Sequence, residues 1–318
     1  MTAMSERGGG VNLGVGGVNE LSLFPSHKHR TNDQFVEEQM QGSWDIIVCE
    51  YTGRAMSEPT DKLIALAGIA SQFSAYLGTT YLAGLWERNL VSQLLWYKQS
   101  IKPGEDGFTD VPEVYTAPSW SWASLNGPIG ASHLSVPNET ESRTIATDTR
   151  RRLKILGYKL ELAEKAAPFG AVTSAELRVR GWLLKAQVTQ STSSLVPDED
   201  HYVMDADLEL QPWDLWELEN PGYAESIGSA VLDDIGNYVE ATEVYCLLVA
   251  KVYHGEWYVF RRIKNQERHT WKHWVLGGLL LVPDDSPGTY RRVGLFHIDP
   301  DYDDRFMCAA KQETLRLI

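Results

Sequence analysis

The chain has 318 residues, of which 43% are hydrophobic and 23% charged, as is typical of globular domains. This length can bury a sizeable core and suits one large domain or two modest ones. A formal net charge of −14 at pH 7 argues against binding to nucleic acid or to an anionic membrane, because both require a basic surface.

The three cysteines, Cys49, Cys246 and Cys308, are far apart and show no CxxC or Cys/His metal-ligand spacing. We therefore expect no disulfide framework, and we expect an intracellular, cytoplasmic location. The first residues lack the apolar run after a basic start that marks a signal peptide. The longest apolar stretch, Trp274–Pro283, is too short to cross a bilayer, so no membrane span is expected.

Residues 1–42 are rich in glycine, serine and asparagine, and this composition predicts a flexible N-terminal segment. The following run, residues 43–54, is apolar and rich in β-branched residues, and its period fits either a strand or the start of a helix. From residue 43 to 318 we expect a single domain, with a helical part at 43–116 and a β-rich part at 117–318.

Two amphipathic helices are predicted in the helical part, at about residues 60–77 and 80–98. Thr60 or Asp61 is a natural N-cap for the first helix, and Gly78 is a natural stop. Both segments repeat apolar residues at spacings of three and four, so each presents one apolar face. We expect the two helices to pack against each other across their short connection.

Beyond Pro118 the hydrophobic period changes from 3.6 to 2, which indicates short strands separated by turns. The acidic stretch 212–238 is interpreted as a long loop or lid, and residues 304–318 as a closing helix. The sequence thus predicts an α+β fold: an N-terminal helical pair packed on a mainly antiparallel β-sandwich or barrel, with a C-terminal helix. The candidate strands are residues 153–163, 175–188, 243–253, 256–263, 273–283 and 289–298.

The stretch Ala117–Gly127, APSWSWASLNG, places two tryptophans two residues apart, between a proline and an Asn-Gly turn signal. In an extended strand, Trp120 and Trp122 point to the same face. They form either a seam of the core or one wall of an aromatic pocket, in which their indole N–H groups bind a ligand oxygen.

The order of five short segments resembles the region that follows the catalytic domain in fungal heterokaryon-incompatibility (HET) proteins. The segments are DKLIALAGIA, YLAGLW, LLWY, APSWSWAS and YRRVGLF, and they run in this order between about Trp44 and Ile298. The string around Trp120 and Trp122 is the most specific of them. In that family a HET domain, a TIR-like fold that triggers cell death, precedes the helix that begins near Asp61. The flexible residues in front of it here are too few for that domain, so we expect the downstream module alone, without the death-signalling chemistry.

Motifs for metal, nucleotide or nucleophile chemistry do not occur in the sequence. The glycines of residues 10–21 lack the lysine of a phosphate loop, and there is no Gly-x-Ser-x-Gly elbow. His269 and His273 are four residues apart, but they run into a strand, which favours a surface pair over a metal site. We therefore expect no metal and no cofactor. Three carboxylate pairs, interpreted as solvated or capping charges, are Asp233/Asp234, Asp284/Asp285 and Asp303/Asp304.

An aromatic pocket without nucleophile, metal or cofactor suits a reaction that needs only a folded substrate and a few hydrogen bonds. By analogy with truncated HET-like proteins of metabolite gene clusters, we predict a cofactor-independent pericyclase of fungal secondary metabolism, closing rings by an intramolecular Diels–Alder type reaction. The expected partner is an apolar small molecule, a terpenoid or a polyene. Two alternatives stay open: a non-enzymatic recognition module of the incompatibility system, and a fragment without activity of its own.

The site is predicted between the second helix and the sheet. Tyr115 and His133 flank the tryptophan stretch and are the expected catalytic donors to a substrate carbonyl, with Arg292 as a third candidate. Alternation in YRRVG turns one arginine inward, and a buried Arg292 requires a carboxylate from the protein or from a ligand. The expected substrate-binding residues are Trp86, Trp120 and Trp122.

Overall fold

A computed structural model of the chain describes residues 33–54, 58–99, 111–130, 134–135, 153–190, 216–219, 226–234, 242–257, 271–298 and 303–318. The chain divides into two compact units, residues 1–44 and 45–318, and helix α1 (Asp33–Thr52) crosses the boundary between them. In the first unit the described residues are those of α1. The second unit holds the sheet and the candidate site.

The first half of α1 corrects the prediction that everything before residue 43 is flexible. Its residues up to 42 are helical, whereas residues 1–32 lie outside the described part of the chain. Met40, Trp44 and Val48 recur every four residues and are buried, and this spacing gives a helix one apolar face. The run 43–54, for which strand and helix were both open, is helical for most of its length.

The first predicted helix is confirmed as a 3-10 turn, η1 (Pro59–Asp61), followed by α2 (Lys62–Leu77). Gly78 ends it with a left-handed φ of 56°, and its N–H donates to the Ser74 carbonyl oxygen at 3.0 Å. Neither α2 nor any other helix in the described residues has the length and hydropathy needed to cross a membrane. The buried apolar residues of α2 are Leu63, Leu66, Ala70, Phe73 and Leu77.

The predicted second helix over residues 80–98 is wrong. The segment begins instead with a β-hairpin of β1 (Tyr81–Leu82) and β2 (Leu85–Trp86). The two turn residues, Ala83 and Gly84, have φ values of 48° and 98°. A tight two-residue hairpin turn uses positive φ at both positions, and a right-handed helix excludes it.

After the hairpin the chain forms only short elements: η2 (Glu87–Asn89), α3 (Leu90–Gln93) and β3 (Tyr97–Lys98), which pairs with β4 (Ile129–Gly130). The Gln93 side chain bonds to the backbone of β2 in the way that a neighbouring strand would. Its Oε1 accepts from the Trp86 N–H at 2.8 Å, and its Nε2 donates to the Trp86 carbonyl oxygen at 2.9 Å. The apolar residues that suggested a helical stripe are therefore buried in a compact, irregular segment.

Among the described residues, nine strands form one large sheet whose pairings are antiparallel except between β12 and β13. This confirms an α+β fold with a mainly antiparallel sheet. Five of the six predicted strand segments lie in these strands, and the sixth, 256–263, is described only at its first two residues, which end β10. The strands are β5 (Leu134–Ser135), β6 (Lys154–Leu162), β7 (Val172–Gln190), β8 (Trp216–Glu219), β9 (Ser226–Leu232), β10 (Thr242–Trp257), β11 (Trp271–Pro283), β12 (Thr289–Ile298) and β13 (Lys311–Leu317).

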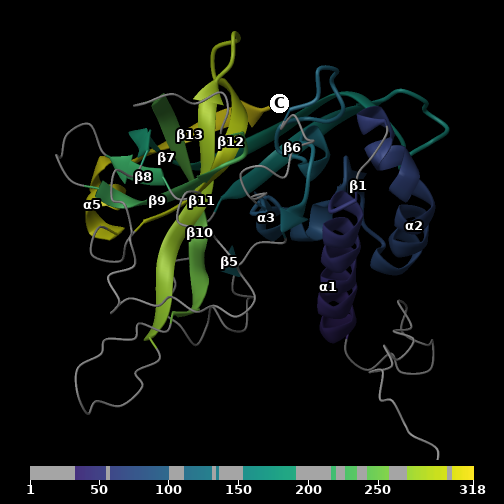
Figure 1. The fold of residues 1–318 in the computed structure, drawn as a ribbon, viewed down its shortest axis with the longest axis horizontal. Helices are drawn as coiled ribbons and strands as arrows, with labels where there is room; N and C mark the ends of the chain where they lie inside the picture. The colour runs from purple at the N-terminus through teal and green to yellow at the C-terminus, as the bar shows by residue number, and fades with distance from the viewer. Residues whose placement is uncertain are drawn as a thin grey trace, which may run out of the picture. The chain divides into compact units, whose positions relative to one another are not determined.

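Six of these strands pair in a closed circuit, in the order β7, β8, β9, β12, β11, β10 and back to β7. The sheet therefore closes on itself as a barrel, and Figure 1 shows the long β10 and β11 of this barrel side by side. Side chains of β7, β9, β10, β11 and β12 fill the core of the barrel, and the Cys246 side chain is among them. Phe306 of α5 (Asp303–Ala309) adds to this core by stacking on Phe296, with ring centroids 5.9 Å apart.

Two further predictions need correction. The stretch 212–238, interpreted as a loop or lid, supplies β8 and β9, which complete the circuit. Both strands are short and flanked by acidic residues, which hid their pattern. The predicted closing helix ends at Ala309, and the chain continues as β13 between β7 and β12. In β13 the buried Leu315 and Leu317 alternate with less buried neighbours, so the period of two prevails over the helical one.

Gly278 of β11 provides a test of how closely the barrel strands approach. A Cβ atom there would lie 2.0 Å from the Leu247 carbonyl oxygen and 2.9 Å from the Val249 nitrogen, both backbone atoms of β10. We expect Gly278→Ala to lower the free energy of unfolding by about 3 kcal/mol, measured by urea denaturation.

Gly68→Ala in α2 is the control, because nothing lies within 4 Å of the Cβ position there. This substitution should raise the free energy of unfolding by about 0.5–1 kcal/mol, since alanine favours the helix. Equal effects of the two substitutions would contradict the packing described for the barrel.

Candidate functional site

The tryptophan motif, residues 117–127, forms turns rather than the predicted strand. A turn at 119–121 leads into a 3-10 helix, η3 (Trp122–Ser124). The Ser121 hydroxyl oxygen accepts from the Ala123 N–H at 3.1 Å and thereby caps this helix. The capping serine favours a helical turn at this point, whereas the alternating sequence pattern favoured a strand. The Trp120 and Trp122 indoles therefore do not share a strand face.

Trp86, Trp120 and Trp122 are core residues of the second unit, with exposed fractions of 1%, 0% and 2%. The Trp122 Nε1 donates to the Gly84 carbonyl oxygen at 3.0 Å. A Cβ atom at Gly84 would lie 2.6 Å from that nitrogen, so the hairpin turn fits against the indole only with glycine. None of the three tryptophans is among the residues that line a cleft beside the motif.

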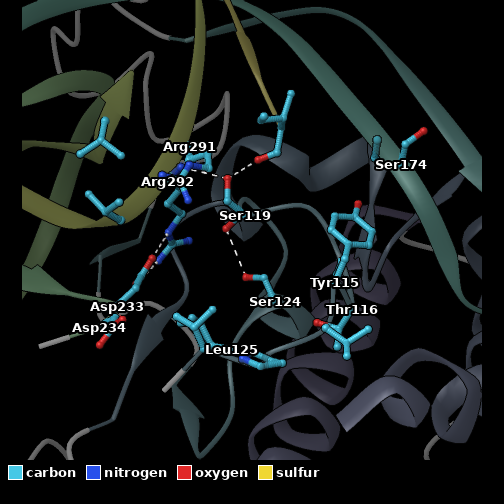
Figure 2. A pocket seen from close by; sticks show the side chains of 18 of the residues that line it. Tyr115, Thr116, Ser119, Ser124, Leu125, Ser174, Asp233, Asp234, Arg291 and Arg292 are labelled. Atoms are coloured by element: carbon cyan, nitrogen blue, oxygen red, sulfur yellow. Dashed lines mark hydrogen bonds and ion pairs between the residues drawn. The ribbon is translucent and has the colours of Figure 1, made fainter. Parts of the chain in front are cut away.

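This cleft has a volume of about 810 Å³ and lies beside the tryptophan motif. Its walls come from the loop around residues 111–125, the first residues of β7, the facing ends of β11 and β12, and the two aspartates after β9 (Figure 2). The apolar residues that line it are Val111, Pro112, Val114, Ala117, Leu125, Ala175, Val282, Val293 and Ile318.

Arg292, a predicted catalytic residue, lines the cleft with a side chain that is 0% exposed. Its Nε and Nη2 donate to the two carboxylate oxygens of Asp233 at 3.0 and 3.1 Å, as Figure 2 shows. Nη1 donates to the Leu94 carbonyl oxygen at 2.8 Å, and Nη2 also donates to that of Trp96. The guanidinium carbon stands 3.3 Å above the Trp96 ring centroid. The carboxylate that a buried Arg292 requires is therefore one of the protein's own.

The interpretation of Asp233 as a solvated or capping charge is wrong, because this residue is only 4% exposed. It follows β9 directly, so the end of that strand fixes its position. Burial raises the pKa of the Asp233 carboxyl, and the Arg292 guanidinium opposes that shift. A guanidinium keeps its proton in proteins, and its charge and two hydrogen bonds favour the ionised form of the Asp233 carboxylate. The sequence signal for this site is an aspartate placed immediately after an apolar strand.

Three hydroxyl groups that line the cleft are bonded within the chain. The Ser119 hydroxyl accepts from the Arg292 N–H at 2.9 Å and donates to the Ile318 backbone oxygen. The Thr116 and Ser124 hydroxyls each donate to a carbonyl oxygen of the motif at 2.7 Å. All three hydroxyls line the cleft, but their hydrogens are already used.

Tyr115, another predicted catalytic residue, presents its phenol to the cleft. It lines the cleft, is 50% exposed, and has no hydrogen bond from its hydroxyl to the described residues. Burial raises its pKa to about 12. The phenol is therefore protonated near neutral pH and is a hydrogen-bond donor.

Lys62, which the sequence did not single out, holds one wall of the cleft in place. The residue is 1% exposed, and its Nζ donates to the carbonyl oxygens of Ala123 and Leu125 and, at 2.9 Å, to the Asn126 Oδ1. Burial, assisted by the charge of Lys98, lowers its pKa to about 8. Because three oxygens converge on one ammonium group, the segment that carries Leu125 is tied to the start of α2.

His133, the remaining predicted catalytic residue, lies outside the described residues, and its role stays a prediction. The same holds for His269, one of the two histidines weighed as a metal pair. In the described ranges no group of three or more His, Cys, Asp or Glu side chains is arranged to hold a metal ion.

Comparisons with protein families, with curated proteins and with solved structures found no match for this chain. The resemblance to the region downstream of the HET domain therefore stays a prediction.

The Arg292–Asp233 pair gives a measurable coupling. Asp233→Ala leaves a buried guanidinium without its carboxylate, and we expect it to lower the free energy of unfolding by about 3–5 kcal/mol. The double variant with Arg292→Met removes both charges and should lose less than the sum of the two single effects. Denaturant unfolding of the four proteins measures this coupling, and additive effects would show that the two residues do not act as a pair.

Proposed function

We propose that the cleft binds an apolar small molecule, a terpenoid or a polyene, and closes a ring in it without a cofactor, as a pericyclase of the Diels–Alder type. The observation that carries the proposal is the make-up of the cleft, with mostly apolar walls around about 810 Å³ and one protonated phenol, Tyr115. The assignment to fungal secondary metabolism rests on the resemblance to HET-like proteins alone and is part of the proposal.

The size and lining of the cleft suit a ligand of this class. Sites for small molecules have volumes of roughly 300–1,000 Å³ and apolar walls with a few polar groups. Because the Thr116, Ser119 and Ser124 hydroxyls already donate within the chain, a ligand rich in polar groups would lose hydrogen bonds to water and find few replacements. A hydrocarbon body with one or two acceptor oxygens avoids that loss.

Ring closure of this type requires only groups that the cleft offers. In an intramolecular Diels–Alder reaction two carbon–carbon σ bonds form as two π bonds are consumed, and no atom, proton or electron enters or leaves. Walls that hold the diene against the dienophile lower the entropic barrier. A phenol that donates to a carbonyl conjugated with the dienophile stabilises the charge that develops on its oxygen. Tyr115 is the residue proposed for this role.

Arg292 serves in this proposal as a positioning residue rather than as a catalytic donor. Its N–H groups are directed to Asp233 and to backbone oxygens of the chain, so it fixes the walls that would hold the substrate. The three buried tryptophans are core residues that do not line the cleft, and they are not proposed to contact the ligand.

A second candidate is a non-enzymatic recognition module of the incompatibility system, and one observation favours it. Val111, Val114 and Tyr115 lie close together in the sequence on the cleft and are 47%, 63% and 50% exposed. Clusters of exposed apolar side chains are typical of surfaces that bind other proteins. In that case an apolar side chain of a partner would fill the cleft.

Tyr115→Phe tests the proposed donor, because phenylalanine keeps the ring and loses the hydroxyl. We expect a rate of cyclisation about 10- to 100-fold lower, with folding and ligand binding nearly unchanged. The substrate is a linear trienone with a tethered diene and enone, and chromatography quantifies its bicyclic isomer against the uncatalysed reaction. Tyr158→Phe on β6 is the matched control, since that hydroxyl bonds to Thr80 and Glu87 and does not line the cleft.

Two outcomes would contradict the proposal at different points. If the wild-type protein does not accelerate cyclisation of the trienone above the uncatalysed rate, the enzyme proposal is contradicted and the recognition module is favoured. If the Tyr115→Phe variant cyclises the trienone at the wild-type rate, the phenol has no role in the mechanism. The cleft would then still be the proposed site of the reaction.

A further inference from the structure

The Asp233 carboxylate at the cleft already has a well-placed cation of the chain as its partner. Asp233 accepts two hydrogen bonds from the buried Arg292 guanidinium. Burial lowers the pKa of Lys98 to about 8, and Asp234 and Asp233 oppose this shift. The Asp233 carboxylate is therefore balanced by the Arg292 guanidinium, and the positive charge of Lys98 is attracted to both aspartates.

Arg291 and Asp284 form a much weaker pair. The Arg291 Nε lies 3.5 Å from the Asp284 Oδ1, beyond the roughly 2.7–2.9 Å of a charge-assisted hydrogen bond. Their side chains are 58% and 26% exposed, so water screens the attraction. Arg291 lines the cleft and pairs across the sheet with Val282, another residue of the wall. Among the described residues that line the cleft, it is the cation whose donors a ligand can take over.

We propose that Arg291 binds a carboxylate of the ligand, which makes the substrate class an apolar carboxylic acid. This inference rests on the proposed function and adds an acidic group to the ligand. A free carboxylate can accept two parallel N–H···O bonds from a guanidinium, whereas Asp284 makes one long contact. The apolar walls also shield a carboxylate in the cleft from part of the solvent, which strengthens its attraction to the arginine.

A single negative charge fits this site better than a phosphate does. Asp233 and Asp234 line the same cleft as Arg291. A phosphate carries up to two negative charges near neutral pH. The second negative charge of a phosphate would be repelled by these carboxylates. Among the described residues that line the cleft, no second cation is available to compensate for this repulsion. A carboxylate needs only the one arginine.

Arg291 and Tyr115 contact different parts of such a ligand. In Figure 2 the two side chains lie to either side of Ser119 within the cleft. The acid group at Arg291 and the carbonyl group at Tyr115 are then separate acceptors on one molecule, with the apolar body between them. A polyene acid that bears a conjugated carbonyl away from its carboxyl end meets both donors.

Fluorescence titration with cis-parinaric acid, a conjugated polyene acid, and with its methyl ester tests the inference, because only the acid carries a charge. We expect the wild-type protein to bind the acid about tenfold more tightly than the ester at neutral pH and low salt. Arg291→Gln should abolish this preference and leave ester binding unchanged, which also shows that the cleft is intact. Asp284→Asn should strengthen acid binding, because the competing carboxylate is gone.

Arg178→Gln is the matched control for net charge, since Arg178 is exposed on β7 and does not line the cleft. The preference for the acid should persist in this variant. Equal affinities of the wild-type protein for acid and ester, or a preference that survives Arg291→Gln, would overturn the carboxylate inference and leave the proposed function standing. If neither probe binds, the proposed polyene site fails and the inference fails with it.

Discussion

The buried guanidinium of Arg292 is the interaction on which the arrangement of the second unit depends. A charge that is removed from water has to be matched by a counter-charge and by acceptors for its donors. The matching groups come from separate places in the chain: Asp233 after β9, and the Leu94 and Trp96 carbonyl oxygens after α3. The barrel and the hairpin segment are therefore joined at one point, and the cleft lies beside it.

The tryptophan motif strengthens the same junction from the other side. Ser119 bonds to the Arg292 N–H and to the Ile318 backbone oxygen, while Ser121 and Trp122 bond to the carbonyl oxygens of the hairpin turn. Two tryptophans stand so close together because one short turn fills the core and binds two distant segments. Since its polar groups serve the fold, the cleft is left with apolar walls and few available donors.

Regular strands and α2 could be predicted from sequence because their periods are long and uninterrupted. The helix predicted over 80–98 failed because a buried hairpin followed by short turns also places apolar residues at helical spacing. The Ala83–Gly84 pair between apolar residues was the opposing signal. At the site, the alternating pattern of β12 could predict that Arg292 points inward. It could not predict the partner, Asp233, which lies 59 residues earlier in the chain. That pairing depends on closure of the barrel, which no local pattern contains.

Methyl NMR of the full chain, titrated with cis-parinaric acid, tests most directly whether the cleft beside Arg292 is the ligand site. Binding there should shift the methyl signals of Val114 and Leu125, which line the cleft, and leave those of Leu248 and Leu280 in the barrel core in place. Shifts confined to the core leucines, or no shift at saturating ligand, would contradict the assignment of this cleft as the functional site.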